Sequence, residues 1–222
     1  MCKDMDVWFH VDGAYGLSFV LIPELRFMFD GMEAADSICW DPHKQFGVPI
    51  PSSIFFVKNK YDFNRMAIFG NYFNRKEESE LNPGLKSPPT TRPFAAFPLL
   101  TTILHQGLDK IRKNLHSPVD AIHSVYQEIV KQKDIEVLHK PQLGILCFRI
   151  IPEVFSENML DDLQVYVYER IKKEGIRSVS MTRLNNKTAI RLVAISPIVT
   201  AEAMLASVAN VRELAAEYKN KL

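Results

Sequence analysis

The sequence predicts an α/β chain made of two parts. Three short apolar runs in the first quarter have the length of β-strands, at residues 7–11, 37–40 and 53–57. The first run lacks polar alternation, which is typical of a strand buried on both faces of a parallel sheet. The second half shows the order helix, strand, helix, strand, strand, helix, which is typical of a small α+β domain.

The two parts meet in a polar, irregular segment. Asparagine, glycine and proline break any periodicity over residues 61–93. Loops of this length in a compact protein are usually lids or linkers. We therefore expect residues 1–93 to be the C-terminal portion of a large domain with a mobile loop and a crossing. Residues 94–222 are then expected to form a connecting helix and a small α+β domain.

Helical patterns begin directly after this segment. An apolar helix is expected over residues 94–107, ended by Gly107, because glycine commonly follows the last turn of a helix. A long amphipathic helix is expected over residues 108–131. We expect it to be interrupted at Pro118, which cannot donate a hydrogen bond to the preceding turn.

The small domain is expected to contain three strands and two further helices. The strands are predicted at residues 144–151, 179–183 and 188–195, and the helices at 156–174 and 200–218. Ser156 is placed to cap the first of these helices, and Gly175 to end it. Asn185 and Asn186 separate the last two strands and favour a tight hairpin turn.

The composition restricts the classes of function. The chain has 222 residues, and 27 basic against 26 acidic residues give a net charge of +1. This balance indicates neither nucleic acid nor an anionic membrane as a partner. No apolar run reaches the roughly 20 residues that span a bilayer, and the first residues lack the apolar core of a secretory signal. We therefore expect a cytoplasmic protein.

The cysteines and histidines suggest neither a disulfide framework nor a metal site. Cys2, Cys39 and Cys147 are odd in number and lack Cys-x-x-Cys spacing. Cys39 and Cys147 lie in apolar runs and are expected to be reduced core residues. The six histidines form no ligand motif, so no metal is expected.

The residues suited to chemistry are concentrated between Val7 and Lys44. Asp12 follows the first predicted strand, and Lys44 ends the turn Asp-Pro-His-Lys after the second. An acid at a strand end can keep a pyridinium nitrogen protonated, and a lysine on a nearby turn can form a Schiff base with an aldehyde. The pair therefore indicates half of a pyridoxal phosphate site, at strand ends of the kind where ligands of α/β sheets collect.

This segment resembles the pyridoxal-dependent decarboxylases of the glutamate, aromatic amino acid and cysteine sulfinate group. Those enzymes carry His-Val-Asp-Ala-Ala-(Tyr/Trp)-Gly-Gly, then Ala-(Asp/Asn)-Ser, then (Asn/Asp)-Pro-His-Lys, which correspond here to residues 10–17, 35–37 and 41–44. Gly13 stands where the family usually has alanine, and Leu17 where the second glycine usually lies. The resemblance implies decarboxylation of an amino acid and an aspartate aminotransferase-like, fold type I, large domain.

The resemblance also implies roles for the residues around the cofactor. Lys44 would form the Schiff base, Asp12 would hold the pyridine nitrogen protonated, and Ala14 would pack on one face of the ring. Asp41 and His43 occupy positions that help to hold the phosphate. His43 is the better candidate, because an acid beside a phosphate is electrostatically awkward. A turn cap for Asp12 and a solvated surface lysine for Lys44 are the structural alternatives.

The resemblance also implies that two residues outside this segment take part in the reaction. Tyr72, followed by Phe73 in the polar segment, resembles a lid tyrosine that protonates the substrate carbon after decarboxylation. An aromatic anchor that pins the loop is its alternative. Arg191, in an otherwise apolar strand, resembles an arginine that binds a substrate carboxylate, and a structural ion pair is the alternative there.

The resemblance maps this chain onto only the second half of a family enzyme. The phosphate-binding loop and the residue stacked over the ring would belong to the first half. We expect an amino acid decarboxylase with a small-molecule substrate, acting as a homodimer or with a complementing N-terminal half. An inactive remnant that dimerises or binds a relative is the alternative from another class. Other fold type I lyases and transaminases share Asp12 and Lys44 but would not need Tyr72.

Overall fold

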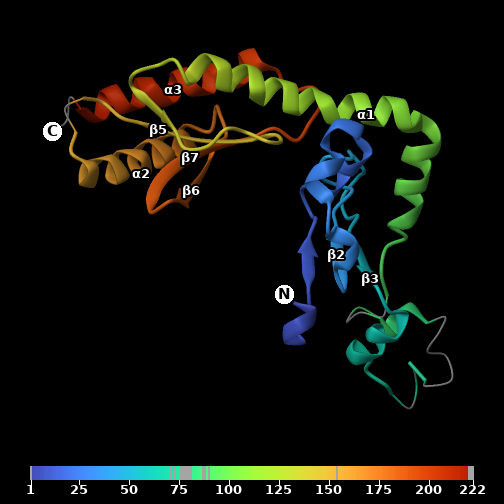
Figure 1. Cartoon of the computed structure of the whole chain (residues 1–222). Coiled ribbons are helices and arrows are strands. Elements are labelled where there is room, and N and C mark those ends of the chain that lie inside the picture. The colour runs from blue at the N-terminus through green and yellow to red at the C-terminus, as the bar shows by residue number, and fades with distance from the viewer. Residues whose placement is uncertain are drawn as a thin grey trace. The chain divides into compact units, whose positions relative to one another are not determined.

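A computed structural model describes residues 2–70, 72, 74–75, 82–86, 89, 91–153 and 155–219. The chain divides into two compact units, Met1–Arg112 and Lys113–Leu222. Helix α1 (Ala96–Ile129) contributes to both units, and Figure 1 shows the order of the elements along the chain.

The first unit contains a three-stranded sheet with the strand order β1-β2-β3. β1 (His10–Asp12) pairs in parallel with β2 (Ser37–Trp40), and β2 pairs antiparallel with β3 (Ile54–Val57). The prediction for the second strand is confirmed in its bounds, and that for the third to within one residue.

The prediction for the first strand is partly wrong. β1 begins three residues later than expected, and its two end residues, His10 and Asp12, are exposed rather than buried. The physical reason lies in the strand order: β1 is at the edge of the sheet, so no further strand of the described residues covers its outer side. The apolar run preceding it, which includes Val7 and Trp8, is exposed as well.

Short 3-10 helices connect β1 to β2, at Leu17–Leu21, Pro23–Phe29 and Met32–Ala34. The first of them carries Phe19, which is fully buried, and Ser18, whose Oγ accepts a hydrogen bond from Trp40 Nε1 at 2.8 Å. Trp40 also packs edge-on against Phe46, with 5.2 Å between ring centroids. These contacts hold the end of β2 and the turn that follows it against the connecting segment.

Helix α1 bends at Gly107, which has a non-helical φ of 71° and ψ of 161° (Figure 1). The glycine therefore marks the boundary predicted there, because it tolerates positive φ without a steric penalty. The interruption predicted at Pro118 is wrong, since the helix continues through it to Ile129. Proline removes one backbone hydrogen bond, but its fixed φ is helical, and fully buried neighbours such as Leu115 and Ile122 keep this stretch packed.

The second unit contains a four-stranded antiparallel sheet with the strand order β4-β5-β7-β6. Its strands are β4 (Ile135–Val137), β5 (Ile145–Ile150), β6 (Ser180–Leu184) and β7 (Lys187–Val193), and its own helices are α2 (Glu157–Glu174) and α3 (Ala201–Lys219). The predicted helices and strands occur in the predicted order, with β4 as one additional strand after α1. β4 was not predicted, because three residues are too few for a periodic pattern.

The turn and the helix end that the sequence predicts in this unit are present, but the predicted helix cap is not formed. Asn185 and Asn186 have φ of 52° and 62° and form the two-residue loop of the β6–β7 hairpin, which requires positive φ at both positions. Gly175 ends α2 in the left-handed conformation, and its N–H donates to Ile171 O. Ser156 occupies the N-cap position of α2, but its side chain makes no capping hydrogen bond.

One face of this sheet forms the core of the unit. Its buried residues include Leu146 and Phe148 of β5, Ile190 of β7, Leu163 of α2 and Val211 of α3. Successive side chains of a strand point to opposite faces. Cys147 and Arg191, which are direct register partners on β5 and β7, therefore lie on the face opposite the helices.

The ends of β5 and β7 beyond this core are held by side chains of α2. Asp161 Oδ1 accepts a hydrogen bond from Thr188 N at 2.8 Å. Gln164 bonds both backbone groups of Ile150, with Oε1 accepting from Ile150 N at 3.0 Å and Nε2 donating to Ile150 O at 2.9 Å. Side chains thus replace the strand partners that these backbone groups would otherwise need.

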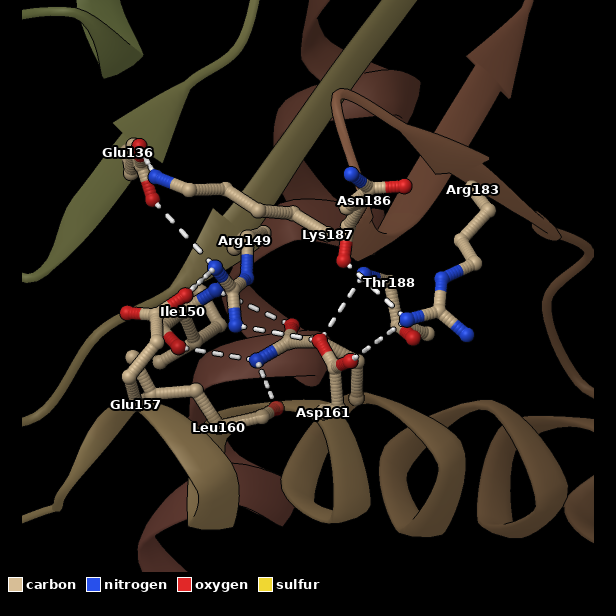
Figure 2. A network of polar contacts seen from close by, with 11 residues as sticks. Glu136, Arg149, Ile150, Glu157, Leu160, Asp161, Arg183, Asn186, Lys187 and Thr188 are labelled. Carbon is tan, nitrogen blue, oxygen red and sulfur yellow. Dashed lines mark hydrogen bonds and ion pairs between the residues drawn. The ribbon is translucent and has the colours of Figure 1, made fainter.

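Arg149 occupies the centre of this region and is fully buried. Its guanidinium lies 2.6 Å from Glu157, 3.2 Å from Asp161 and 3.7 Å from Glu136, as Figure 2 shows. Three carboxylates from β4 and α2 therefore neutralise one buried cation. Within the described part of the chain, no helix is long and apolar enough to cross a membrane.

Replacing Arg149 by methionine is expected to lower the free energy of unfolding by about 3 kcal/mol, because three carboxylates lose their shared cation. Arg170 pairs with Glu174 and Glu217 at the surface, so Arg170→Met is the matched control, with a clearly smaller expected loss. Urea unfolding followed by far-UV circular dichroism measures both. Equal losses in the two variants would contradict a special role for the buried arginine.

Candidate functional site

Asp12 lies at the end of β1, and its carboxylate is held by two donors. Ala14 N donates to Oδ1 at 3.1 Å, and Cys39 Sγ donates to the same oxygen at 3.2 Å. The bond from Ala14 and then that from Cys39 hold the pKa of Asp12 below its usual value, so the group is ionised at neutral pH. No donor among the described residues reaches Oδ2. One carboxylate oxygen is therefore available to a ligand.

The backbone after Asp12 packs closely against β2, which explains Gly13. A Cβ at this position would lie 2.7 Å from Cys39 O and 2.9 Å from Leu17 Cβ, closer than real Cβ contacts. Gly13 and Leu17 are the two positions that depart from the motif described above. The departures are therefore coupled, because the Leu17 side chain occupies space that a side chain at position 13 would need.

Lys44 lies in the turn that follows β2 and forms an ion pair with Asp41. The distance from Lys44 Nζ to Asp41 Oδ2 is 3.0 Å, and Ser53 Oγ donates to Asp41 Oδ1 at 2.6 Å. Partial burial opposes the ionisation of Asp41. The hydrogen bonds from Ser53 and Lys44 outweigh this effect, so the pKa of Asp41 lies below its usual value. The acid at position 41 is thus a charged partner of the lysine.

The structure brings Asp41, His43 and Lys44 into one polar group, and Asp12 ends the neighbouring strand. The charge of Lys44 contributes to the lowered pKa of Asp12. His43 Nδ1 lies 2.6 Å from Ser52 O, which can only accept, so Nδ1 carries the hydrogen. His43 Nε2 lies 4.0 Å from Asp41 Oδ2. Parallel pairing of β1 with β2 places these residues at the same edge of the sheet.

Two residues of the site were not found by sequence reasoning. Cys39 was expected to be a core residue, but it is only partly buried and its thiol bonds Asp12. The signal for it is its place opposite Asp12 in the strand register. Gln45, directly after Lys44, is 3% exposed, and neither end of its amide has a hydrogen-bond partner in the described part of the chain. An unpaired buried amide costs about 1–3 kcal/mol.

Tyr72 is not packed into this group, because its side chain is 88% exposed. Phe73, named with it in the sequence, lies outside the described residues. The surrounding loop is held instead by the buried Asn74, whose Nδ2 donates to Ile68 O at 3.2 Å and Gly84 O at 3.3 Å.

Arg191 lies on β7 in the second unit and is half-buried. No ion pair within the described residues includes it, so the structural alternative for this arginine finds no support there. The described residues also contain no group of three or more histidine, cysteine, aspartate or glutamate side chains that could hold a metal ion.

Comparison with known proteins agrees with these features. The profile of a family described as "Pyridoxal-dependent decarboxylase conserved domain" matches residues 1–151. An aromatic-L-amino-acid decarboxylase of Bacillus atrophaeus is 31% identical over 222 residues, which cover 98% of this chain and 46% of that protein. An L-2,4-diaminobutyrate decarboxylase of Acinetobacter baumannii is 29% identical over 88% of this chain and 39% of that protein. The chain spans less than half the length of these relatives.

Solved structures show the same fold over the same portion. Mouse CSAD in apo form has a TM-score of 0.81 at 21% identity, covering 96% of this chain and 47% of that one. Oryza sativa TDC, solved with PLP and tryptamine, has a TM-score of 0.82 at 22% identity, covering 98% of this chain and 46% of that one. The predicted α/β fold class is therefore confirmed as a fold similar to part of these proteins.

The bond between Cys39 and Asp12 makes a testable difference to the reactivity of the thiol. Burial and then the hydrogen bond to Asp12 raise the pKa of Cys39. Asp12→Asn removes the negative charge, so the pKa of Cys39 is expected to fall and more thiolate to be present at about pH 8. Iodoacetamide should alkylate Cys39 several-fold faster in this variant, as measured by mass spectrometry of peptides.

Cys2 provides the internal control, because its alkylation rate should be the same in both proteins. If Cys39 reacted at the same rate as before, or more slowly, the hydrogen bond that Cys39 donates to Asp12 would not control the reactivity of the thiol.

Proposed function

Because the chain belongs to the pyridoxal-dependent decarboxylase family, we propose that it carries the lysine-and-acid half of the pyridoxal phosphate site of an amino acid decarboxylase. The observation that carries this proposal is the ionised Asp12, with Oδ2 uncommitted, at the same sheet edge as the turn that carries Lys44. The proposal includes the aspartate aminotransferase-like, fold type I, arrangement, with the second unit as its small C-terminal domain.

The residues present fit the cofactor. An ionised carboxylate with an available oxygen suits a protonated pyridine nitrogen, and Lys44, with a side chain 35% exposed, is accessible to an aldehyde. Pyridoxal phosphate supplies, when bound, an electron sink for the negative charge left on the substrate carbon after carbon dioxide departs. Asp12 would hold the proton at the ring nitrogen, and Ala14 would line one face of the ring.

Asp41 and His43 are proposed to have different roles, although both stand at positions of the motif that help to hold the phosphate. Asp41 is ionised and paired with Lys44, so it would repel a phosphate and instead hold the lysine side chain in place. His43 donates through Nδ1 to Ser52 O, which fixes the orientation of its ring. Its Nε2 is therefore the atom that would face a phosphate group, and His43 remains the better of the two candidates.

Tyr72 is proposed to protonate the substrate carbon. Its exposed position on a loop held at Asn74 suits a donor that reaches the site only when substrate is bound. In the complete enzyme, Tyr72→Phe should lower the rate of carbon dioxide release by about 100-fold or more. The exposed Tyr61→Phe should leave the rate unchanged, and equal rates for both variants would exclude the role.

The remaining half of the site is proposed to come from an N-terminal half, either in a longer polypeptide or in a separate chain. The outer edge of β1 is open among the described residues, and apolar side chains near it are exposed, including Val7, Trp8, Phe55 and Phe56. An open strand edge beside apolar surface is suited to pairing with additional strands. The proposal also includes a homodimer of the completed enzyme and an amino acid as its small-molecule substrate.

The proposal is tested by the selectivity of a chemical adduct. The 222-residue chain is incubated with pyridoxal phosphate, reduced with borohydride and mapped by mass spectrometry. A saturable adduct on Lys44 is expected, since its amine lies beside Asp41 and near Asp12. Lys58, an exposed lysine of the same unit that donates to Glu33 O, is the internal control and should be modified only slightly.

Lys44→Arg should remove the main adduct, whereas Lys58→Arg should not change it. Equal modification of the two lysines in the unaltered chain would contradict a working half-site. The chain by itself would then fit the inactive remnant, and pyridoxal phosphate binding would require the N-terminal half.

A further inference from the structure

One face of the sheet in the first unit carries pairs of polar side chains that bond each other across β1 and β2. His10 and Asp12 of β1 lie on this face, as do Ser37 and Cys39 of β2, because side chains alternate along a strand. The parallel register sets His10 opposite Ser37 and Asp12 opposite Cys39. His10 Nδ1 lies 2.8 Å from Ser37 Oγ, and Cys39 Sγ donates to Asp12 Oδ1 at 3.2 Å. Each of these residues of β2 therefore holds its register partner on β1.

The thiol of Cys39 ties the Asp12 carboxylate to the neighbouring strand. The other donor to Oδ1, Ala14 N, lies only two residues further along the chain, so it belongs to the same turn as Asp12 itself. The Ser37 hydroxyl is engaged elsewhere, because its Oγ also accepts from Trp8 Nε1 at 2.8 Å. The bond from Cys39 therefore fixes the acid relative to β2, the strand that leads into the turn of Lys44.

Both donors bond the same carboxylate oxygen, and this determines which oxygen stays available. Ala14 N and Cys39 Sγ donate to Oδ1, and no donor among the described residues reaches Oδ2 of Asp12. The last torsion of an aspartate side chain has broad energy minima, so a carboxylate without such bonds rotates easily. Donors from two different elements restrict this rotation. They therefore keep Oδ1 toward the protein and leave Oδ2 for a ligand.

The protonation states of the two partners support this bond at neutral pH. Burial and then the hydrogen bond to Asp12 raise the pKa of the Cys39 thiol, so the thiol keeps the proton that it donates. The bonds from Ala14 and then from Cys39 lower the pKa of Asp12, so the acceptor is an anion. A hydrogen bond to an ionised acceptor is stronger than one between neutral groups.

We propose that Cys39 is a positioning residue of the cofactor site, which holds Asp12 by one carboxylate oxygen and so presents the other to the ring nitrogen of pyridoxal phosphate. The inference rests on the proposed function and deepens it, because it adds a residue that acts on the cofactor only through Asp12. A carboxylate that is already oriented loses little freedom when it binds the protonated nitrogen. Without the thiol, part of the binding free energy is needed to order the Asp12 side chain.

The hold of Cys39 on Asp12 is measured without cofactor, from the pKa of the Asp12 carboxyl group in the full chain. Aspartate carboxyl groups labelled with 13C are titrated by NMR, and Asp12→Asn identifies the resonance. Cys39→Val removes the donor from a side chain of similar size, so the pKa of Asp12 should rise. Cys39→Ser keeps a donor and should keep the pKa low. Cys2→Val removes another thiol of the same unit and should leave the pKa unchanged.

The effect on the ligand is measured with two compounds, pyridoxal phosphate and its deaza analogue, in which carbon replaces the ring nitrogen. Quenching of tryptophan fluorescence gives the dissociation constants. Cys39→Val should raise the constant for pyridoxal phosphate roughly fivefold, as expected when one side chain must be ordered on binding. The constant for the analogue should not change, because the analogue has no ring nitrogen for Asp12 to bind. Cys39→Ser should bind both compounds like the unaltered chain.

An unchanged pKa of Asp12 in Cys39→Val would overturn the inference, as would equal weakening of both compounds, which indicates a packing defect. Cys39→Ala also removes the donor and replaces Cys39→Val if the valine variant does not fold. An adduct on Lys44 together with an unchanged pKa of Asp12 refutes the role of Cys39 alone. No adduct on Lys44 together with the expected pKa changes refutes the half-site, and with it the cofactor as the ligand that Cys39 serves, although the thiol would still hold Asp12.

Discussion

The parallel pairing of β1 with β2 is the constraint on which the candidate site depends. It sets Asp12 opposite Cys39, so that the thiol and Ala14 N bond the same carboxylate oxygen, and it leads β2 directly into the turn of Lys44. The close approach of the two strands also requires glycine at position 13. One register thus orients the acid, excludes a side chain beside it and places the lysine at the same sheet edge.

The two arginines in the central strands of the second unit have different surroundings. Arg149 is buried and neutralised by three carboxylates, so it stabilises the junction of β5 with α2 (Figure 2). Arg191 faces a pocket without an acid. A charged group without a partner is costly when it is buried, so the fully buried arginine is the one that the chain supplies with carboxylates.

The sequence predicted those features that depend on local signals. The bounds of β2, the Asn185-Asn186 hairpin and the stop at Gly175 follow from apolar runs and from positive φ, which short segments specify. The sequence prediction failed where distant contacts decide the outcome. β1 is exposed because it is the edge strand of the sheet among the described residues, and α1 continues through Pro118 because buried neighbours pack around it. Cys39 could be recognised in the site only after the strand register was known. The roles of Lys44, Tyr72 and Arg191 stay predictions.

The central claim is that Asp12 and Lys44 act together on one ligand. A double-mutant cycle with Asp12→Asn and Lys44→Gln tests it most directly, with the dissociation constant for pyridoxal phosphate measured by quenching of tryptophan fluorescence. We expect the losses in binding free energy to be non-additive by at least about 0.5 kcal/mol, as is typical of residues that share a partner. Strictly additive losses, or no loss from either substitution, would contradict a shared cofactor site.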